Sequence, residues 1–141
     1  MLSNPQISSL ADGLAERLSG GRERIARAAL AADRGVQSVT LLAVSKGQSA
    51  ARVRAALALG LTQFGENYAD EAVTKIRALS DTPAQWHFIG RLQANKTRAV
   101  AEHFSWVHSV DRLRIAERLS APHPLHAPAL NLCLQVSVAN E

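Results

Sequence analysis

The chain has 141 residues, of which 47% are hydrophobic and 20% are charged, and its formal net charge is +4. This length suits one compact domain with a hydrophobic core, and the composition is ordinary for a globular protein. Basic and acidic residues are mixed, as in Arg22-Glu23-Arg24, which argues against a nucleic-acid-binding surface. No apolar run is long enough to span a bilayer, so we expect no membrane partner.

Cysteine and histidine usage narrows the chemistry further. Cys133 is the single cysteine and lies in an apolar run, so we expect a buried thiol, no intrachain disulfide and a reducing cytoplasmic compartment. His123 and His126 share one loop, but two nitrogen ligands without a third make a poor metal site. We therefore expect no bound metal.

The first segment predicts a leading helix over about residues 7–33. Leu10, Leu14 and Leu18 repeat at intervals of four, which is the spacing of one helical face. Gly20-Gly21 interrupts this pattern and predicts a break or kink, and Gly35 is expected to end the helix.

The rest of the chain alternates between strand and helix patterns. Apolar runs predict strands at 39–44, 62–65, 85–89, 105–110 and 131–138. Helical patterns lie between them, and three of these helices start at a residue suited to capping: Asn67, Asn95 and Asp111. The alternation indicates a parallel sheet with right-handed crossovers.

Among parallel architectures, a (β/α) barrel is favoured because the sequence has neither a dinucleotide-binding glycine motif nor a phosphate-binding P-loop. Barrels place their chemistry at the carboxyl ends of the strands. Polar residues occupy those positions here: Lys46, Glu66, Asn67, Arg91, Gln93, Ser109 and Asp111.

Lys46 follows the first predicted strand, which is apolar throughout. An amine next to apolar walls is poorly solvated as an ammonium, and a neutral amine can attack a carbonyl to form a Schiff base. The alternative is an ordinary surface lysine at a strand end. Asn67 likewise has a simpler interpretation as a helix cap, and His87 as a hydrogen-bonded core residue.

Four strings, in this order, resemble the pyridoxal phosphate homeostasis protein family. They are Leu42-Ala43-Val44-Ser45-Lys46, Phe64-Gly65-Glu66-Asn67-Tyr68, the segment 86–96 (WHFIGRLQANK) and the segment 106–112 (WVHSVDR). The resemblance covers about residues 39–138. It implies an α/β fold: a parallel TIM-type barrel of the alanine racemase N-terminal type, here represented by its first five strands.

The resemblance also implies a function and a site. Lys46 would hold pyridoxal 5′-phosphate (PLP) as a Schiff base, and Asn67, His87 and Ser109 would line the cofactor pocket. The family is associated with intracellular balance of vitamin B6 vitamers and amino acids, without a catalysed reaction. One alternative is a PLP-dependent racemase-like enzyme, which needs a second base on the opposite face of the substrate. Another is a fragment that does not retain the cofactor.

We expect a single domain over residues 1–141, with a leading helix at 1–34 and five β/α units at 39–138. A complete eight-stranded barrel needs about 250 residues. In the family, three further strands supply phosphate-binding groups and an arginine that faces the pyridine nitrogen, so this chain is expected to be a piece of a longer protein or a truncation. The remainder of the barrel or a second copy is expected to cover the open sheet edge.

Overall fold

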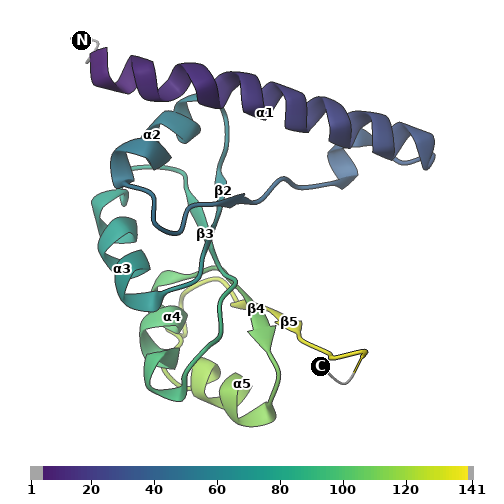
Figure 1. Ribbon diagram of the computed structural model, residues 1–141. Helices are drawn as coiled ribbons and strands as arrows, with labels where there is room; N and C mark the ends of the chain where they lie inside the picture. Colours follow the sequence, from purple (N-terminus) through teal and green to yellow (C-terminus); the bar gives the residue numbers. More distant parts are fainter. Residues whose placement is uncertain (1–4, 140–141) are drawn as a thin grey trace.

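The computed structural model describes the backbone of residues 5–139 and the side chains of residues 13–139. Five parallel strands form one sheet in the order of the sequence, β1-β2-β3-β4-β5 (Figure 1). The leading helix was expected from about residue 7 and begins at Pro5, and the side chain of Leu10, expected on its apolar face, lies outside the described side chains. The strands are β1 (Ala43–Val44), β2 (Gln63–Glu66), β3 (Gln85–Phe88), β4 (Trp106–Val110) and β5 (Asn131–Leu134).

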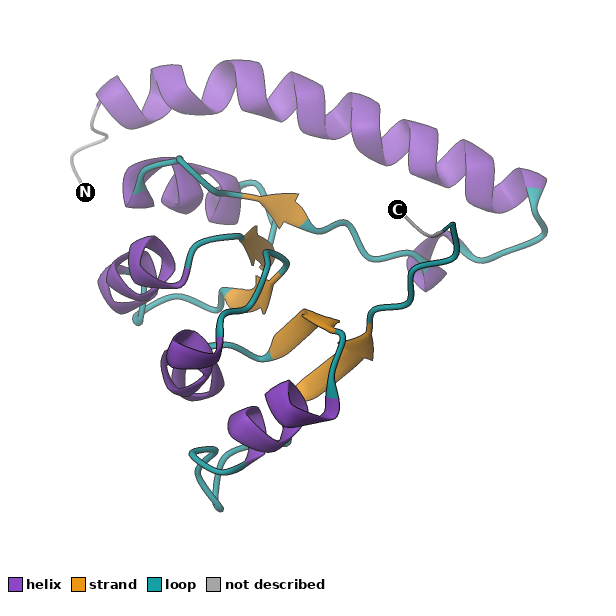
Figure 2. Cartoon of the chain, turned by 60° about the horizontal axis from the view of Figure 1, so that its bottom comes forward, coloured by secondary structure: helices purple, strands orange, loops and turns teal. Residues whose placement is uncertain are grey.

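Helices connect the strands and lie along one face of the sheet, while no described helix covers the other face (Figure 2). The long helix α1 (Pro5–Ala31) crosses one end of this arrangement and contacts α2. The remaining elements are η1 (Val36–Ser38), α2 (Ala50–Ala58), α3 (Ala69–Ala78), η2 (Ala94–Lys96), α4 (Thr97–His103) and α5 (Leu113–Ser120).

The hydrophobic core lies between the sheet and these helices. Because side chains alternate across a strand, every second residue faces the helices. Phe64, Phe88 and Val107 are buried on this outer face. Helix residues complete the layer, among them Val53, Ala72, Leu79, Val100 and Leu119. The opposite, inner face is the one that a barrel encloses. The expected fold, a parallel TIM-type α/β architecture represented by five strands, is confirmed.

The prediction of a break at Gly20-Gly21 is wrong, because α1 runs without interruption through both glycines. Glycine lowers helix stability but removes no backbone hydrogen bond, so it does not by itself end a helix. The helix ends before Gly35 instead. Asp33 adopts the left-handed conformation (φ 54°), and the Arg34 amide donates to the Ala29 carbonyl at 2.8 Å. This is a Schellman ending with aspartate in the position that glycine usually takes.

The expected first strand is shorter and less buried than its apolar sequence indicates. Only Ala43–Val44 pairs with β2, and Val44 is 53% exposed. β1 is an edge strand whose inner side is uncovered, so an apolar run does not ensure burial here. Within the described residues, no helix is long and apolar enough to cross a membrane.

The three predicted helix caps are also wrong. The N-cap positions of α3, α4 and α5 are Tyr68, Lys96 and Arg112, and none makes a side-chain capping bond. Each helix therefore begins one residue later than the capping pattern indicates. Asn67, Asn95 and Asp111 lie before these positions.

Candidate functional site

Lys46 lies in a tight turn directly after β1. The Gln48 amide donates to the Ser45 carbonyl at 3.0 Å, and Gly47 has φ +70°. A positive φ at the third position of a β-turn is the requirement that glycine satisfies in type II turns. Lys46 therefore occupies the second position of a glycine-dependent turn at the carboxyl edge of the sheet.

The side chain of Lys46 is exposed, contrary to the expectation of an amine held against apolar walls. The register explains this difference. Val44 precedes Lys46 by two residues on the same face of the chain, and Val44 is itself exposed on the uncovered inner face. Lys46 lies at the carboxyl end of the strand, as predicted. Its amine would lose contact with water only if another part of the protein covered the inner face.

Asn67 and Ser109 lie at the same edge, after β2 and near the end of β4, and each has a buried polar atom without a partner. Asn67 Oδ1 and Ser109 Oγ are both inaccessible to solvent and lack hydrogen-bond partners within the described part of the chain. Buried polar atoms are nearly always paired, so these two atoms, like Glu66 Oε2 on the helix side of the sheet, have hydrogen-bonding capacity that no described residue uses.

Two hollows at this edge contain these residues and share the loop Gly90–Arg91. One is lined by Asn67, Asp70 and Lys96, and the other by Ser109 and Arg112. Gly90 allows the loops after β2 and β3 to approach closely, since a Cβ there would meet the backbone of Asn67. Arg91 lines both hollows, so the site includes a guanidinium that the sequence analysis noted only as a polar strand-end residue.

His87 lies on the inner face, below the carboxyl edge of the sheet. It is in register with Gly65 and Val44, and Val44 precedes Lys46 by two residues. Its Nε2 is 2.7 Å from Gln63 Oε1, and its Nδ1 is 2.9 Å from His108 Nε2. The Gln63 amide nitrogen donates to Gln85, so Gln63 Oε1 is the acceptor and His87 Nε2 donates. His87 Nδ1 therefore accepts the proton of His108.

The ring of His87 also stacks on Trp106, with ring centroids 5.6 Å apart and planes at 5°. Burial, together with the neighbouring His108, lowers the pKa of His87 from 6.5 to about 4. At neutral pH the ring is an uncharged, doubly hydrogen-bonded group beneath the strand-end residues. His87 is a buried, hydrogen-bonded residue, as its simpler interpretation predicts. Its position below Asn67 is also compatible with a pocket floor.

Glu66 was expected to be a strand-end polar residue, but its side chain faces the helices. It is fully buried, accepts a hydrogen bond from Ser45 Oγ at 2.8 Å, and pairs with Lys75 of α3. Lys75 is also buried and donates to the Ser45 carbonyl at 2.8 Å. Lys75 is not among the residues that the sequence patterns predict for the site. Its position, three residues after Ala72 on the buried face of α3, was the available signal.

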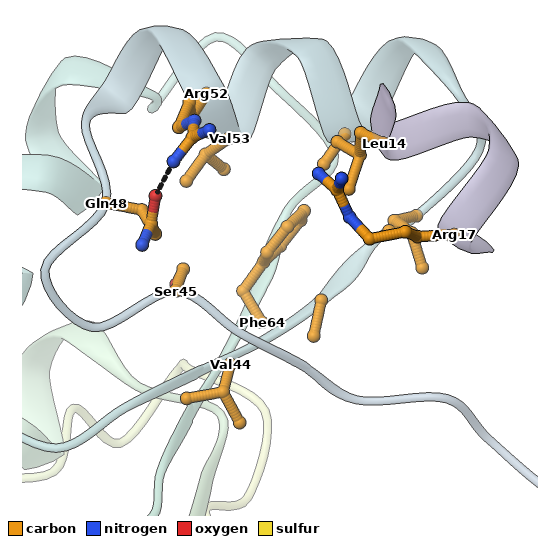
Figure 3. Close-up of a pocket in the computed structure, with 11 residues that line it drawn as sticks. Leu14, Arg17, Val44, Ser45, Gln48, Arg52, Val53 and Phe64 are labelled. Carbon is orange, nitrogen blue, oxygen red and sulfur yellow. Dashed lines mark hydrogen bonds between the residues drawn. The ribbon is translucent and has the colours of Figure 1, made fainter. Parts of the chain in front are cut away.

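A separate cavity lies elsewhere, between α1, α2 and β1 (Figure 3). Leu14 and Arg17 reach it from α1, and Arg52 and Gln48 form a hydrogen bond at its rim. None of Lys46, Asn67, His87 and Ser109 lines it. The structure therefore brings Lys46, Asn67 and Ser109 to one edge, with His87 one layer below, and leaves this cavity apart from them.

No protein-family model matches the chain. Curated proteins do match. One from Pseudomonas aeruginosa named pyridoxal phosphate homeostasis protein is 56% identical over 128 residues, and one of the same name from Escherichia coli K12 is 46% identical over 131 residues. Each match covers 91% of this chain and 56% of the relative, so the chain spans about half the length of the curated relatives it matches.

Solved structures agree with the sequence matches. PipY of Synechococcus elongatus PCC7942, solved with PLP bound, aligns with a TM-score of 0.75 and 41% identity over 90% of this chain and 56% of PipY. The structure of PipY without PLP aligns with a TM-score of 0.76 and 42% identity, over 89% of this chain and 54% of PipY. The resemblance of the sequence to the pyridoxal phosphate homeostasis protein family is thus confirmed over most of this chain.

Proposed function

We propose that this chain forms part of a PLP-binding protein that maintains intracellular vitamin B6 vitamers and amino acids, without turnover of its own. The observation that supports this most directly is the pair of unpartnered buried atoms, Asn67 Oδ1 and Ser109 Oγ, at the edge where Lys46 lies. The names of the curated relatives and the PLP-bound PipY structure support the choice of ligand.

The residues at this edge suit PLP chemically. The aldehyde of PLP is an electrophile for a primary amine, and Lys46 Nζ is the amine that we assign to it. Asn67 and Ser109 would supply hydrogen bonds to polar groups of the cofactor, and His87 would form the pocket floor as an uncharged ring. Arg91 would add positive charge at the rim, which favours an anionic ligand.

The test uses the three lysines of the chain: Lys46, Lys75 and Lys96. The protein is incubated with PLP, reduced with borohydride, and analysed by peptide mass spectrometry. We expect the adduct on Lys46, because Lys75 is buried in an ion pair and Lys96 pairs with Asp70. Lys46→Ala should abolish the adduct and Lys96→Gln should retain it.

Asn67→Ala and Ser109→Ala should each weaken PLP binding about fivefold, the effect of losing one hydrogen bond of about 1 kcal/mol. An adduct on Lys96 instead, or none on Lys46, would contradict the assignment. Solvent deuterium at the α-carbon of alanine, added with PLP, would point to a racemase-like enzyme. PLP binding much weaker than that of a longer relative would favour a fragment that does not retain the cofactor.

We further infer a cytoplasmic location, with no nucleic-acid or membrane partner. The single cysteine and the mixed surface charges support this. The inner face of the sheet would be covered by the remainder of a barrel or by a second copy, which would also surround Lys46 with protein and reduce its hydration.

A further inference from the structure

The turn that contains Lys46 is anchored to α3 on both sides of the lysine. Before it, the Ser45 carbonyl accepts a hydrogen bond from Lys75 Nζ at 2.8 Å. After it, the Gly47 amide donates to Glu71 Oε1 at 2.7 Å. Lys75 and Glu71 are one helical turn apart on α3 and are themselves 3.2 Å apart. One face of α3 therefore contacts both residues that flank Lys46.

The anchor before Lys46 contains a buried ion pair. The side chains of Lys75 and Glu66 are 5% and 0% exposed, and Glu66 also accepts from the Ser45 hydroxyl. Removing both charges from water is unfavourable, so a buried pair contributes little net stability, but it accepts only a narrow range of geometries. Ser45 is consequently fixed through its carbonyl and its hydroxyl together.

The anchor after Lys46 is more accessible. The side chain of Glu71 is 37% exposed, so its removal leaves no buried charge. The Gly47 amide and, less strongly, Lys75 hold the pKa of the Glu71 carboxyl below its usual value. Glu71 is ionised at neutral pH, and a hydrogen bond from an amide to a carboxylate is stronger than one between neutral groups.

Building on the proposed function, we propose that Glu71 and the Lys75–Glu66 pair are positioning residues for the attachment of PLP to Lys46. They do not contact the cofactor. They hold the backbone on either side of Lys46, so that its side chain leaves the turn in one direction, toward the edge where Asn67 and Ser109 lie. Such support by neighbouring groups is what gives a reactive side chain a defined location.

The test replaces Glu71, because its loss should leave the fold intact. Glu71→Ala removes the acceptor for the Gly47 amide, and Glu71→Gln restores a carbonyl acceptor without the charge. Glu102→Ala is the matched control. Glu102 also pairs with a basic residue one helical turn away, Arg98 at 3.2 Å, but on α4. Thermal unfolding of all variants checks that the fold is kept.

The first readout is the ratio of borohydride-fixed PLP adduct on Lys46 to that on Lys96. We expect Glu71→Ala to lower this ratio about tenfold, consistent with the loss of one hydrogen bond to a charged group. Glu71→Gln should recover most of the ratio, and Glu102→Ala should match the unmodified protein. An unchanged ratio in Glu71→Ala would overturn the proposal.

The second readout needs no cofactor. Amide hydrogen exchange at Gly47 should be faster in Glu71→Ala and unchanged in Glu102→Ala, because only the first loses the acceptor of the Gly47 amide. Unchanged exchange at Gly47 in Glu71→Ala would refute the positioning role whether or not PLP binds. Absence of a Lys46 adduct in the unmodified protein would refute the proposed function instead, so the two failures are distinguishable.

Discussion

Two consecutive residues of the chain, Glu66 and Asn67, have opposite surroundings. Glu66 faces the helices, is fully buried, and pairs with Lys75 through its Oε1, while its Oε2 has no partner among the described residues. Asn67 follows the strand and lines a hollow with Asp70 and Lys96, and its Oδ1 has no partner among the described residues. The first residue belongs to the proposed support of the Lys46 turn, and the second belongs to the candidate site.

His87 gives a residue-scale prediction for pH dependence. Its folded pKa of about 4 lies below the usual 6.5, so between these values the unfolded chain binds a proton that the folded protein does not. Stability is therefore lost as pH falls from about 6.5 to about 4. Protonation of Nδ1 would also place two N–H groups of His87 and His108 against each other.

We expect His87→Gln to remove the part of this loss of stability that comes from His87. That part is on the order of 2 kcal/mol, a figure reduced because water on the uncovered inner face screens the charge of the ring. The measurement is urea unfolding at pH 7 and pH 4.5. Replacement of His126, which is exposed in a loop, provides the control and should leave the pH dependence unchanged. A His87→Gln protein with the full acid sensitivity of the parent would contradict the prediction.

At the scale of elements, α1 continues through the two glycines at which the sequence pattern predicts a break. The two glycines lie within a helix of 27 residues. A Cβ added at either glycine would meet no neighbouring atom within 4 Å. Nothing in the structure therefore requires glycine at these positions, and the helix continues because its hydrogen bonds on either side are intact.

Gly20→Ala should therefore stabilise the protein by about 0.5–1 kcal/mol, the difference in helix propensity between the two residues. Thermal and urea unfolding measure this change. Gly90→Ala is the contrasting variant, because its Cβ would press on the Asn67 backbone, and we expect a loss of about 1–3 kcal/mol. A destabilising Gly20→Ala would contradict the prediction, because open space surrounds this position.

At the scale of the whole molecule, the sheet has two unpaired edges and an uncovered inner face. Val44 on β1 is 53% exposed and Leu134 on β5 is 79% exposed. Exposed edge strands with apolar side chains tend to pair with other chains. In the described residues, the helices cover only the opposite face (Figure 2).

We therefore expect the 141-residue chain, when isolated, to self-associate, as measured by size-exclusion chromatography with light scattering. Leu134→Lys should reduce the association, because it places a charge on the exposed edge. Leu125→Lys is the control, since Leu125 is 97% exposed in the loop between α5 and β5, outside the paired strands, and its replacement should have no effect. A monodisperse monomer of the unmodified chain would contradict this prediction.

The sequence determined the alternation of strands and helices, the parallel sheet, and the placement of Lys46 and Asn67 after the first two strands and of Ser109 near the end of the fourth, because these depend on local periodicity and chain order. Only the tertiary structure decided which face each side chain occupies, since that depends on register and on what lies opposite. The tertiary structure exposed Lys46, placed His87 in a hydrogen-bonded layer below, turned Glu66 toward Lys75, and ended α1 at Ala31. Pairings such as Lys75 with Ser45 join residues far apart in the chain, and short-range patterns contain no information about them.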